Sequence, residues 1–163
     1  MSLRVLTVCA GNICRSPAAA AAIAEEAAIA GLDVVVDSAG TGAWNVGDSP
    51  HPRAVAAGER AGLDIEGRAR RVNKLDFERF DVILAMDRAN YRDLMDMTPS
   101  LEGRAKIRLF RTYDHATEED EVPDPYGGPD SGYDETITQV RSAAAGFVES
   151  LVSASVEDAV TLE

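Results

Sequence analysis

Cys9 and Arg15 are the residues best suited to joint chemistry, and they bracket a short loop. The stretch reads Cys9-Ala10-Gly11-Asn12-Ile13-Cys14-Arg15-Ser16. A thiolate is a strong nucleophile, and a planar guanidinium pairs with two oxygens of a phosphate or similar oxyanion. Successive backbone N–H groups can bind the remaining oxygens. The pattern predicts that Cys9 attacks phosphorus in line, in an oxyanion site formed by Ala10, Gly11, Asn12, Ile13, Cys14 and Arg15.

The segments on either side of this loop favour the same interpretation. Residues 3–8 form a short apolar run typical of a β-strand. Ser16-Pro17 has the form of a helix start, with serine as N-cap and proline at the first helical position, and an alanine-rich helix is predicted over 17–30. A helix N-terminus attracts anions, so it favours the thiolate form of Cys9.

Strands alternate with helices along the rest of the chain, which predicts an α/β fold. The expected architecture is three-layer α/β/α with a four-stranded parallel sheet and a phosphate-binding loop after the first strand. Predicted strands cover 3–8, 33–37, 81–86 and 105–110, and predicted helices cover 17–30, 52–61, 74–79, 88–97 and 133–152. We expect a single domain over 1–152 and a flexible C-terminal tail over 153–163.

Composition excludes several classes of function. The net charge of -12 argues against nucleic-acid binding, which needs cationic contacts. The sequence has no apolar run of spanning length, so no membrane partner is expected, and the N-terminus lacks the pattern of a cleaved signal, which favours a cytoplasmic location. Two cysteines are too few for a structural zinc site, and no metal or cofactor is expected.

Four stretches resemble the low-molecular-weight protein-tyrosine phosphatases. They are VCAGNICRSP over 8–17, SAGT over 38–41, FDVILAMDRANYRDL over 80–94 and VPDPYG over 122–127, in the order found in that family. The resemblance implies hydrolysis of phosphotyrosine in proteins, and of small aryl phosphates, through a phosphocysteine on Cys9. It also implies that Asp124 is the general acid and base. Composition alone does not choose between Asp124 and its neighbours Asp120 and Glu121.

The resemblance also implies supporting roles. Asn12 and Ser38 hold the loop in a strained shape, although Ser38 also fits an ordinary turn residue. Ser16 is either an N-cap or a hydroxyl that stabilises the thiolate. Trp44 and Tyr126 enclose a phenyl ring next to Ile13, the alternative for Trp44 being a place in the core.

Cys14 and the two histidines complete the set of reactive side chains. Two cysteines that span a tight loop could form a disulfide when peroxide oxidises Cys9. The resemblance implies that Cys14 is this redox partner and protects the nucleophile. His51 and His115 are in no ligand spacing, and neither is given a catalytic role.

Three other functions compete with phosphotyrosine hydrolysis. An arsenate reductase needs further cysteines downstream, and none follows Cys14. Protein-arginine phosphatases of the same family carry threonine at the position of Ile13, and an apolar Ile13 beside an aromatic slot favours a phenyl ring. A module that only binds phosphate needs no thiolate. The expected partners are phosphotyrosine-containing proteins, with inorganic phosphate or another oxyanion in the site.

Overall fold

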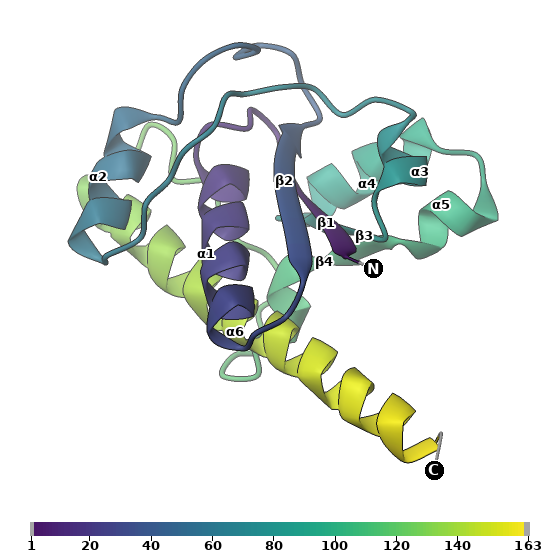
Figure 1. Cartoon of the computed structure of the whole chain (residues 1–163). Helices are drawn as coiled ribbons and strands as arrows, with labels where there is room; N and C mark the ends of the chain where they lie inside the picture. Colours follow the sequence, from purple (N-terminus) through teal and green to yellow (C-terminus); the bar gives the residue numbers. More distant parts are fainter. Residues whose placement is uncertain (1, 162–163) are drawn as a thin grey trace.

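Four parallel strands form one sheet, which confirms the α/β class predicted from the sequence. In the computed structural model, which describes residues 2–161, the strand order is β2-β1-β3-β4 (Figure 1). Within β1, Cys9 pairs with Gly40 of β2, and Val8 pairs with Ala85 of β3. The carboxyl ends of these strands, and the loops that follow them, therefore meet at one edge of the sheet. The strands are β1 Leu3–Cys9, β2 Val34–Gly40, β3 Val82–Ala85 and β4 Ile107–Leu109.

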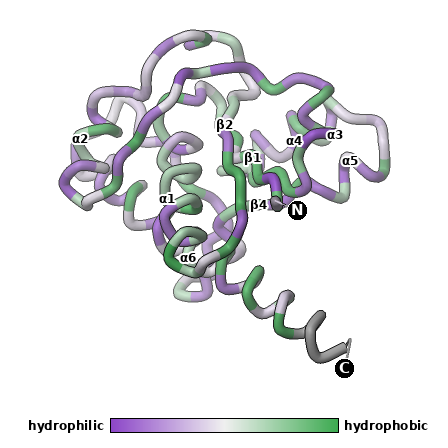
Figure 2. Tube along the Cα trace, viewed as in Figure 1, coloured by the Kyte–Doolittle hydropathy of each residue, from purple (hydrophilic) through white to green (hydrophobic). Residues whose placement is uncertain are grey.

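Helices cover both faces of the sheet, as the three-layer prediction requires. Helix α1 (Arg15–Ile29) packs with α6 (Asp130–Thr161) on one face, and α4 (Arg88–Met97) packs against β3 and β4. Alternate residues of β1 enter two separate cores: Val5 joins the cluster with α1 and α6, and Val8 joins the cluster that contains α4. Hydrophobic residues accordingly follow the strands, whereas the outer connections are more polar (Figure 2).

The shorter helices lie around this three-layer body. Helix α2 (Pro52–Arg60) packs on α6, and α3 (Asp76–Arg79) precedes β3. Both were expected from the sequence. Helix α5 (Leu101–Ala105) and the 3-10 helix η1 (Phe110–Tyr113) were not, because neither has room for a recognisable apolar period.

The C-terminal helix is longer than the sequence indicated. Helix α6 starts at Asp130 rather than Tyr133 and continues to Thr161. Residues 153–161 of the expected flexible tail are therefore helical, and its last two residues, 162–163, lie outside the described residues. Its last turns extend away from the body (Figure 1), and Val152 and Val156 are exposed. Residues 152–156 are thus exposed within the helix, and no glycine or proline after Gly146 interrupts it. None of the described helices is both long enough and apolar enough to span a bilayer.

Candidate active site

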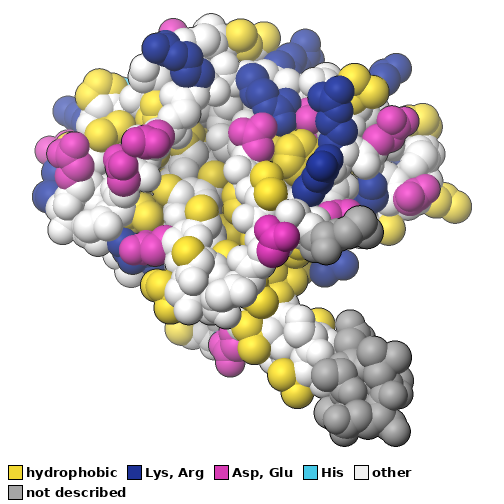
Figure 3. Space-filling model, viewed as in Figure 1, with side chains coloured by type: hydrophobic (Ala, Val, Ile, Leu, Met, Phe, Trp, Pro, Cys, Tyr) yellow, Lys and Arg dark blue, Asp and Glu magenta, His cyan; other side chains and the backbone are white. Residues whose placement is uncertain are grey.

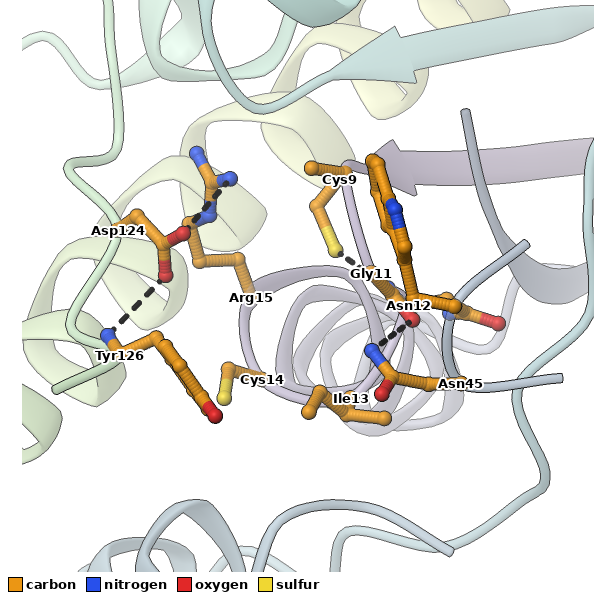
Figure 4. A pocket seen from close by; sticks show the side chains of 11 residues that line it. Cys9, Gly11, Asn12, Ile13, Cys14, Arg15, Asn45, Asp124 and Tyr126 are labelled. Atoms are coloured by element: carbon orange, nitrogen blue, oxygen red, sulfur yellow. Dashed lines mark hydrogen bonds and ion pairs between the residues drawn. The ribbon is translucent and has the colours of Figure 1, made fainter. Parts of the chain in front are cut away.

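A cavity of about 270 Å³ opens at the edge of the sheet where Cys9 ends β1. The β1–α1 loop lies at its base, and two walls come from the segment after β2 and the segment before α6 (Figure 4). The structure thus brings together three segments that lie far apart in the sequence. The lining residues are Cys9, Ala10, Gly11, Asn12, Ile13, Cys14, Arg15, Trp44, Asn45, Asp124 and Tyr126.

The sulfur of Cys9 is buried and faces hydrogen-bond donors. The backbone N–H of Asn12 donates to Sγ at 3.2 Å, and the hydroxyl of Ser16 lies 3.0 Å from it. The side-chain Nδ2 of Asn12 donates to Ser16 Oγ at 2.8 Å, which leaves the hydroxyl hydrogen of Ser16 free to point at sulfur. Donors directed at sulfur stabilise the thiolate relative to the thiol.

Asn12 adopts a left-handed backbone conformation, with φ 58°, that is costly for a residue other than glycine. Its side chain is fixed at both ends. Oδ1 accepts from the backbone N–H of Arg70 at 3.0 Å, and Nδ2 also donates to Ser38 Oγ at 2.9 Å. These bonds hold the β1–α1 loop in the curve that places its N–H groups around the cavity.

The start of α1 corrects one prediction. The helix begins at Arg15 and its N-cap position is Cys14, so Ser16 lies inside the first turn and is not the N-cap. The hydroxyl of Ser16 also lies 3.4 Å from the carbonyl oxygen of Ala39. Of the two interpretations open for Ser16, its position therefore matches the one in which the hydroxyl faces the sulfur.

Arg15 is only 3% exposed and is held by acidic and carbonyl oxygens. Its Nη1 donates to Asp87 Oδ2 at 2.6 Å and to the carbonyl oxygen of Val122 at 3.0 Å, and its Nη2 lies 3.8 Å from Asp124 Oδ2. Burial alone would lower the pKa of Arg15, but the negative charges of Cys9, Asp87 and Asp124 outweigh it and raise that pKa. The guanidinium is therefore a permanent, fixed cation beside the sulfur.

Asp124 lies at the rim, 52% exposed, across the cavity from the β1–α1 loop. Its Oδ1 accepts from the N–H of Tyr126 at 3.1 Å (Figure 4). The neighbouring acids Asp120 and Glu121 instead pair with Arg88 at the start of α4, at 2.6 and 3.4 Å, and line no part of the cavity. Of the three acids left open by composition, the structure brings only Asp124 to the sulfur's cavity.

Two aromatic side chains stand on the rim, and both are exposed. Trp44 is 75% exposed, so it is not a core tryptophan, and Tyr126 is 65% exposed. The ring of Trp44 lies against Gly42, where an added Cβ would overlap it. Together with Ile13, these rings form an apolar part of the cavity lining.

Cys14 also lines the cavity and is 5% exposed. Burial, together with the negative charges of Cys9 and Asp124, raises the pKa of Cys14 to about 12. Both cysteines are free thiols. Among residues 2–161, no group of three or more His, Cys, Asp or Glu side chains is placed to hold a metal ion.

Comparison with known proteins shows which protein family the chain resembles. The family model described as low molecular weight phosphotyrosine protein phosphatase matches residues 4–157. The chain belongs to this family. It is therefore a hydrolase of the low-molecular-weight protein-tyrosine phosphatase type, as the four sequence stretches indicated.

Individual relatives of this phosphatase family support the assignment over nearly the whole chain. A putative low molecular weight protein-tyrosine phosphatase of Synechocystis is 39% identical over 151 residues, covering 91% of this chain and 96% of its own. A crystal structure of a protein tyrosine phosphatase from Entamoeba histolytica, with Hepes in its active site, has a TM-score of 0.91 and 33% identity, covering 94% and 99%. The YwlE arginine phosphatase, in a cysteine-to-serine mutant with a phosphorylated active-site serine, has a TM-score of 0.82 and 27% identity, covering 91% and 95%.

Sequence reasoning missed two residues of this phosphatase site. Asp87 pairs with Arg15 and also caps α4, accepting from the N–H of Asn90 at 2.8 Å. Its position directly after a parallel strand was an available signal. His51 was given no role, yet its ring packs edge-on to Tyr126 and stacks on Tyr133, with centroids at 5.8 and 5.6 Å. No local pattern indicates that contact.

Proposed function

We propose that this phosphatase hydrolyses phosphotyrosine in proteins, and small aryl phosphates, through a phosphocysteine on Cys9. The observation that carries the proposal is the position of the Cys9 sulfur. It lies 3.2 Å from a loop N–H and 3.0 Å from a hydroxyl, in the same cavity as Arg15 and Asp124. A thiolate beneath an anion cradle is placed to attack a bound phosphoryl group.

In the first step the sulfur displaces the tyrosyl oxygen. The phosphoryl oxygens bind the loop N–H groups and the guanidinium of Arg15, which offset the charge that spreads over them. An electron pair of the Cys9 sulfur forms the S–P bond as the P–O bond to tyrosine breaks. Asp124 gives a proton to the leaving oxygen, because an unprotonated alkoxide or phenoxide leaves poorly.

In the second step water releases the phosphate. Asp124, now a carboxylate, accepts a proton from a water molecule whose oxygen bonds to phosphorus. The S–P bond breaks, the Cys9 thiolate is restored, and inorganic phosphate leaves the site. Asn12, Ser16 and Ser38 act in both steps by holding the loop and the hydroxyl that faces sulfur.

Substrate choice rests on the rim. The exposed rings of Trp44 and Tyr126, with Ile13 below, form an apolar slot suited to a phenyl ring rather than to a guanidinium. The likeness to YwlE keeps phosphoarginine as the alternative substrate. Arsenate reduction is disfavoured because no cysteine follows Cys14 to relay the oxidation. We also retain two predictions, Cys14 as redox partner of Cys9 and a cytoplasmic location.

The test compares three variants on phenyl phosphate, a phosphotyrosine peptide and phosphoarginine. Cys9→Ser should show no turnover, and Asp124→Asn should lower kcat on phenyl phosphate by about 100-fold. Asp120→Asn is the matched control, because Asp120 pairs with Arg88 away from the cavity, and it should stay within about twofold of wild type.

Two outcomes would contradict the proposal. Turnover by Cys9→Ser would remove Cys9 as the nucleophile. A higher kcat/KM on phosphoarginine than on the phosphotyrosine peptide would replace the proposed substrate by the alternative.

A further inference from the structure

An ion pair between a buried carboxylate and a partly exposed arginine lies outside the cavity, and the proposed mechanism does not use it. Asp76, the first residue of α3, is 2% exposed. Both its oxygens bind the guanidinium of Arg70, Nη1 to Oδ2 and Nη2 to Oδ1, each at 3.0 Å. Asp76 also accepts from the backbone N–H of Asn73 at 2.8 Å. Fork-to-fork pairing of this kind fixes orientation as well as distance.

Arg70 has further partners, although its side chain is 31% exposed. Its Nε donates to Asp37 Oδ2 of β2 at 3.1 Å. Its backbone N–H donates to Asn12 Oδ1 at 3.0 Å, and its carbonyl oxygen accepts from Gly40 N–H at 2.8 Å. The side chain thus anchors the residue to β2 and α3, while its main chain lies against the β1–α1 loop.

A chain of hydrogen bonds runs from Arg70 through Asn12 and Ser16 to the sulfur of Cys9, and each bond constrains how the next side chain is oriented. Because Oδ1 of Asn12 accepts from Arg70, Nδ2 must be the end that faces Ser16 and Ser38. Because Ser16 Oγ accepts from Nδ2, its own hydrogen is available for donation, and the sulfur of Cys9 at 3.0 Å is a nearer acceptor than the carbonyl oxygen of Ala39 at 3.4 Å. The sequence of contacts begins at Asp76 and ends at the nucleophile.

We infer that Asp76 and Arg70 are positioning residues for the phosphatase reaction, acting through Asn12 to direct the Ser16 hydroxyl at Cys9. The inference rests on the proposed function, since it names residues that prepare the same nucleophile. Without the side-chain anchor, the main chain of Arg70 keeps its bond to Gly40 but can shift, which weakens the bond from its N–H to Asn12 Oδ1. The Ser16 hydroxyl can then turn to the carbonyl oxygen of Ala39. The thiolate then loses a donor.

The experiment measures the nucleophile directly. Asp76→Asn and Arg70→Lys each remove the paired hydrogen bonds between the carboxylate and the guanidinium. The rate of Cys9 alkylation by iodoacetamide is measured against pH in both variants, and mass analysis identifies the modified residue. We expect the midpoint of Cys9 alkylation to rise by about one pH unit and kcat on phenyl phosphate to fall about tenfold, with a smaller change in KM. Arg15, Asp124 and Cys14 also face the cavity, and neither variant alters them.

The control is the exposed ion pair between Arg60 and Asp134, whose Nη2–Oδ1 distance is 2.6 Å. Asp134→Asn should leave both the midpoint and kcat unchanged. A second arm combines Asp76→Asn with Asn12→Ala. If Asp76 acts through Asn12, the double variant should be within about twofold of Asn12→Ala alone.

The outcomes separate the inference from the proposed function. If the variants melt at a lower temperature but keep the wild-type alkylation midpoint, the Asp76–Arg70 pair has only a structural role. If the losses of kcat in the double variant multiply, Asp76 does not act through Asn12. If Asp76→Asn does not fold, Arg70→Lys decides alone. A wild type whose Cys9 is alkylated normally but that hydrolyses no phosphate ester would contradict the proposed function. The positioning inference would then be judged from the alkylation midpoints of the variants alone.

Discussion

Cys9 and Cys14 share one cavity but have different electrostatic surroundings. Two donors face the sulfur of Cys9, whereas burial and nearby negative charge raise the pKa of Cys14 to about 12. At neutral pH Cys14 is therefore a thiol, and it becomes a useful nucleophile only after losing a proton. Oxidation of Cys9 to the neutral sulfenic acid removes one of the charges that raise this pKa, while the effect of burial remains.

The rate of disulfide closure should therefore depend on pH. Cys9 is first oxidised by a short peroxide pulse, the pH is then changed, and the Cys9–Cys14 bond is measured by quenched alkylation and mass analysis. Closure joins the Cys14 thiolate to the sulfenic sulfur and releases water. Well below the pKa of Cys14 the thiolate fraction rises tenfold per pH unit, so the closure rate should rise by nearly tenfold per pH unit, about 100-fold in all, between pH 6 and 8.

Cys14→Ser is the control for this prediction. It should form no intramolecular bond and should accumulate sulfinic acid on Cys9 under the same pulse. A closure rate that is independent of pH, or a wild type that forms no bond, would contradict the redox role of Cys14.

At the scale of elements, local patterns predicted what short stretches of sequence determine. Helix α4 was predicted over 88–97 and has those bounds, because apolar spacing and a preceding aspartate define it locally. The contact of Asp87 with Arg15 was missed, because 72 positions separate the two residues and only the parallel register of β1 and β3 brings them together. The anchor formed by Asp76 and Arg70 was missed for a similar reason: its contacts reach Asp37 and Asn12.

Packing between elements also depends on single glycines. Gly146 of α6 lies so close to η1 that an added Cβ would overlap the carbonyl oxygen of Tyr113. Gly146→Ala should lower the free energy of unfolding by about 1–3 kcal/mol, because α6 must shift away from η1. Denaturant unfolding measures the change, and activity per folded molecule should stay at the wild-type level because Gly146 lines no part of the cavity.

Gly132, near the start of the same helix, provides the comparison. An added Cβ there meets only Pro125 Cβ at 3.9 Å, so Gly132→Ala should be neutral or slightly stabilising through its better helix propensity. Equal losses of stability in both variants would mean that backbone effects, and not the contact with η1, dominate at Gly146.

At the scale of the whole molecule, charge is distributed unevenly. The chain carries a net charge of -12, yet Lys and Arg side chains gather on one part of the surface, where the segment between α2 and α3 crosses (Figure 3). The stretch from Gly67 to Lys74 in that segment contains four cations and no acid. The proposed anion site uses the loop N–H groups and Arg15, which is 3% exposed, so we expect its attraction for phosphate to be local and little affected by the acidic surface.

The length of α6 separates the end of the chain from this site. Tyr133, near the start of the helix, stacks on His51 beside the cavity, and 32 residues at 1.5 Å each make a helix about 48 Å long. Leu151 still packs against the main core, whereas Val152 and Val156 are exposed. Among the residues of α6 up to Val156, the part that packs on the domain core therefore ends near Leu151.

Two truncations test this division. A chain that ends at Val156 should keep the wild-type kcat/KM on phenyl phosphate and a melting temperature within about 1 °C, because it keeps Leu151 and the exposed residues 152–156 that follow it. A chain that ends at Glu149 loses Leu151 and should melt several degrees lower, since removing a partly buried leucine costs about 1–2 kcal/mol. A loss of activity on truncation at Val156, or a change in sedimentation coefficient larger than the lost mass explains, would mean that the extended end of α6 takes part in the active assembly.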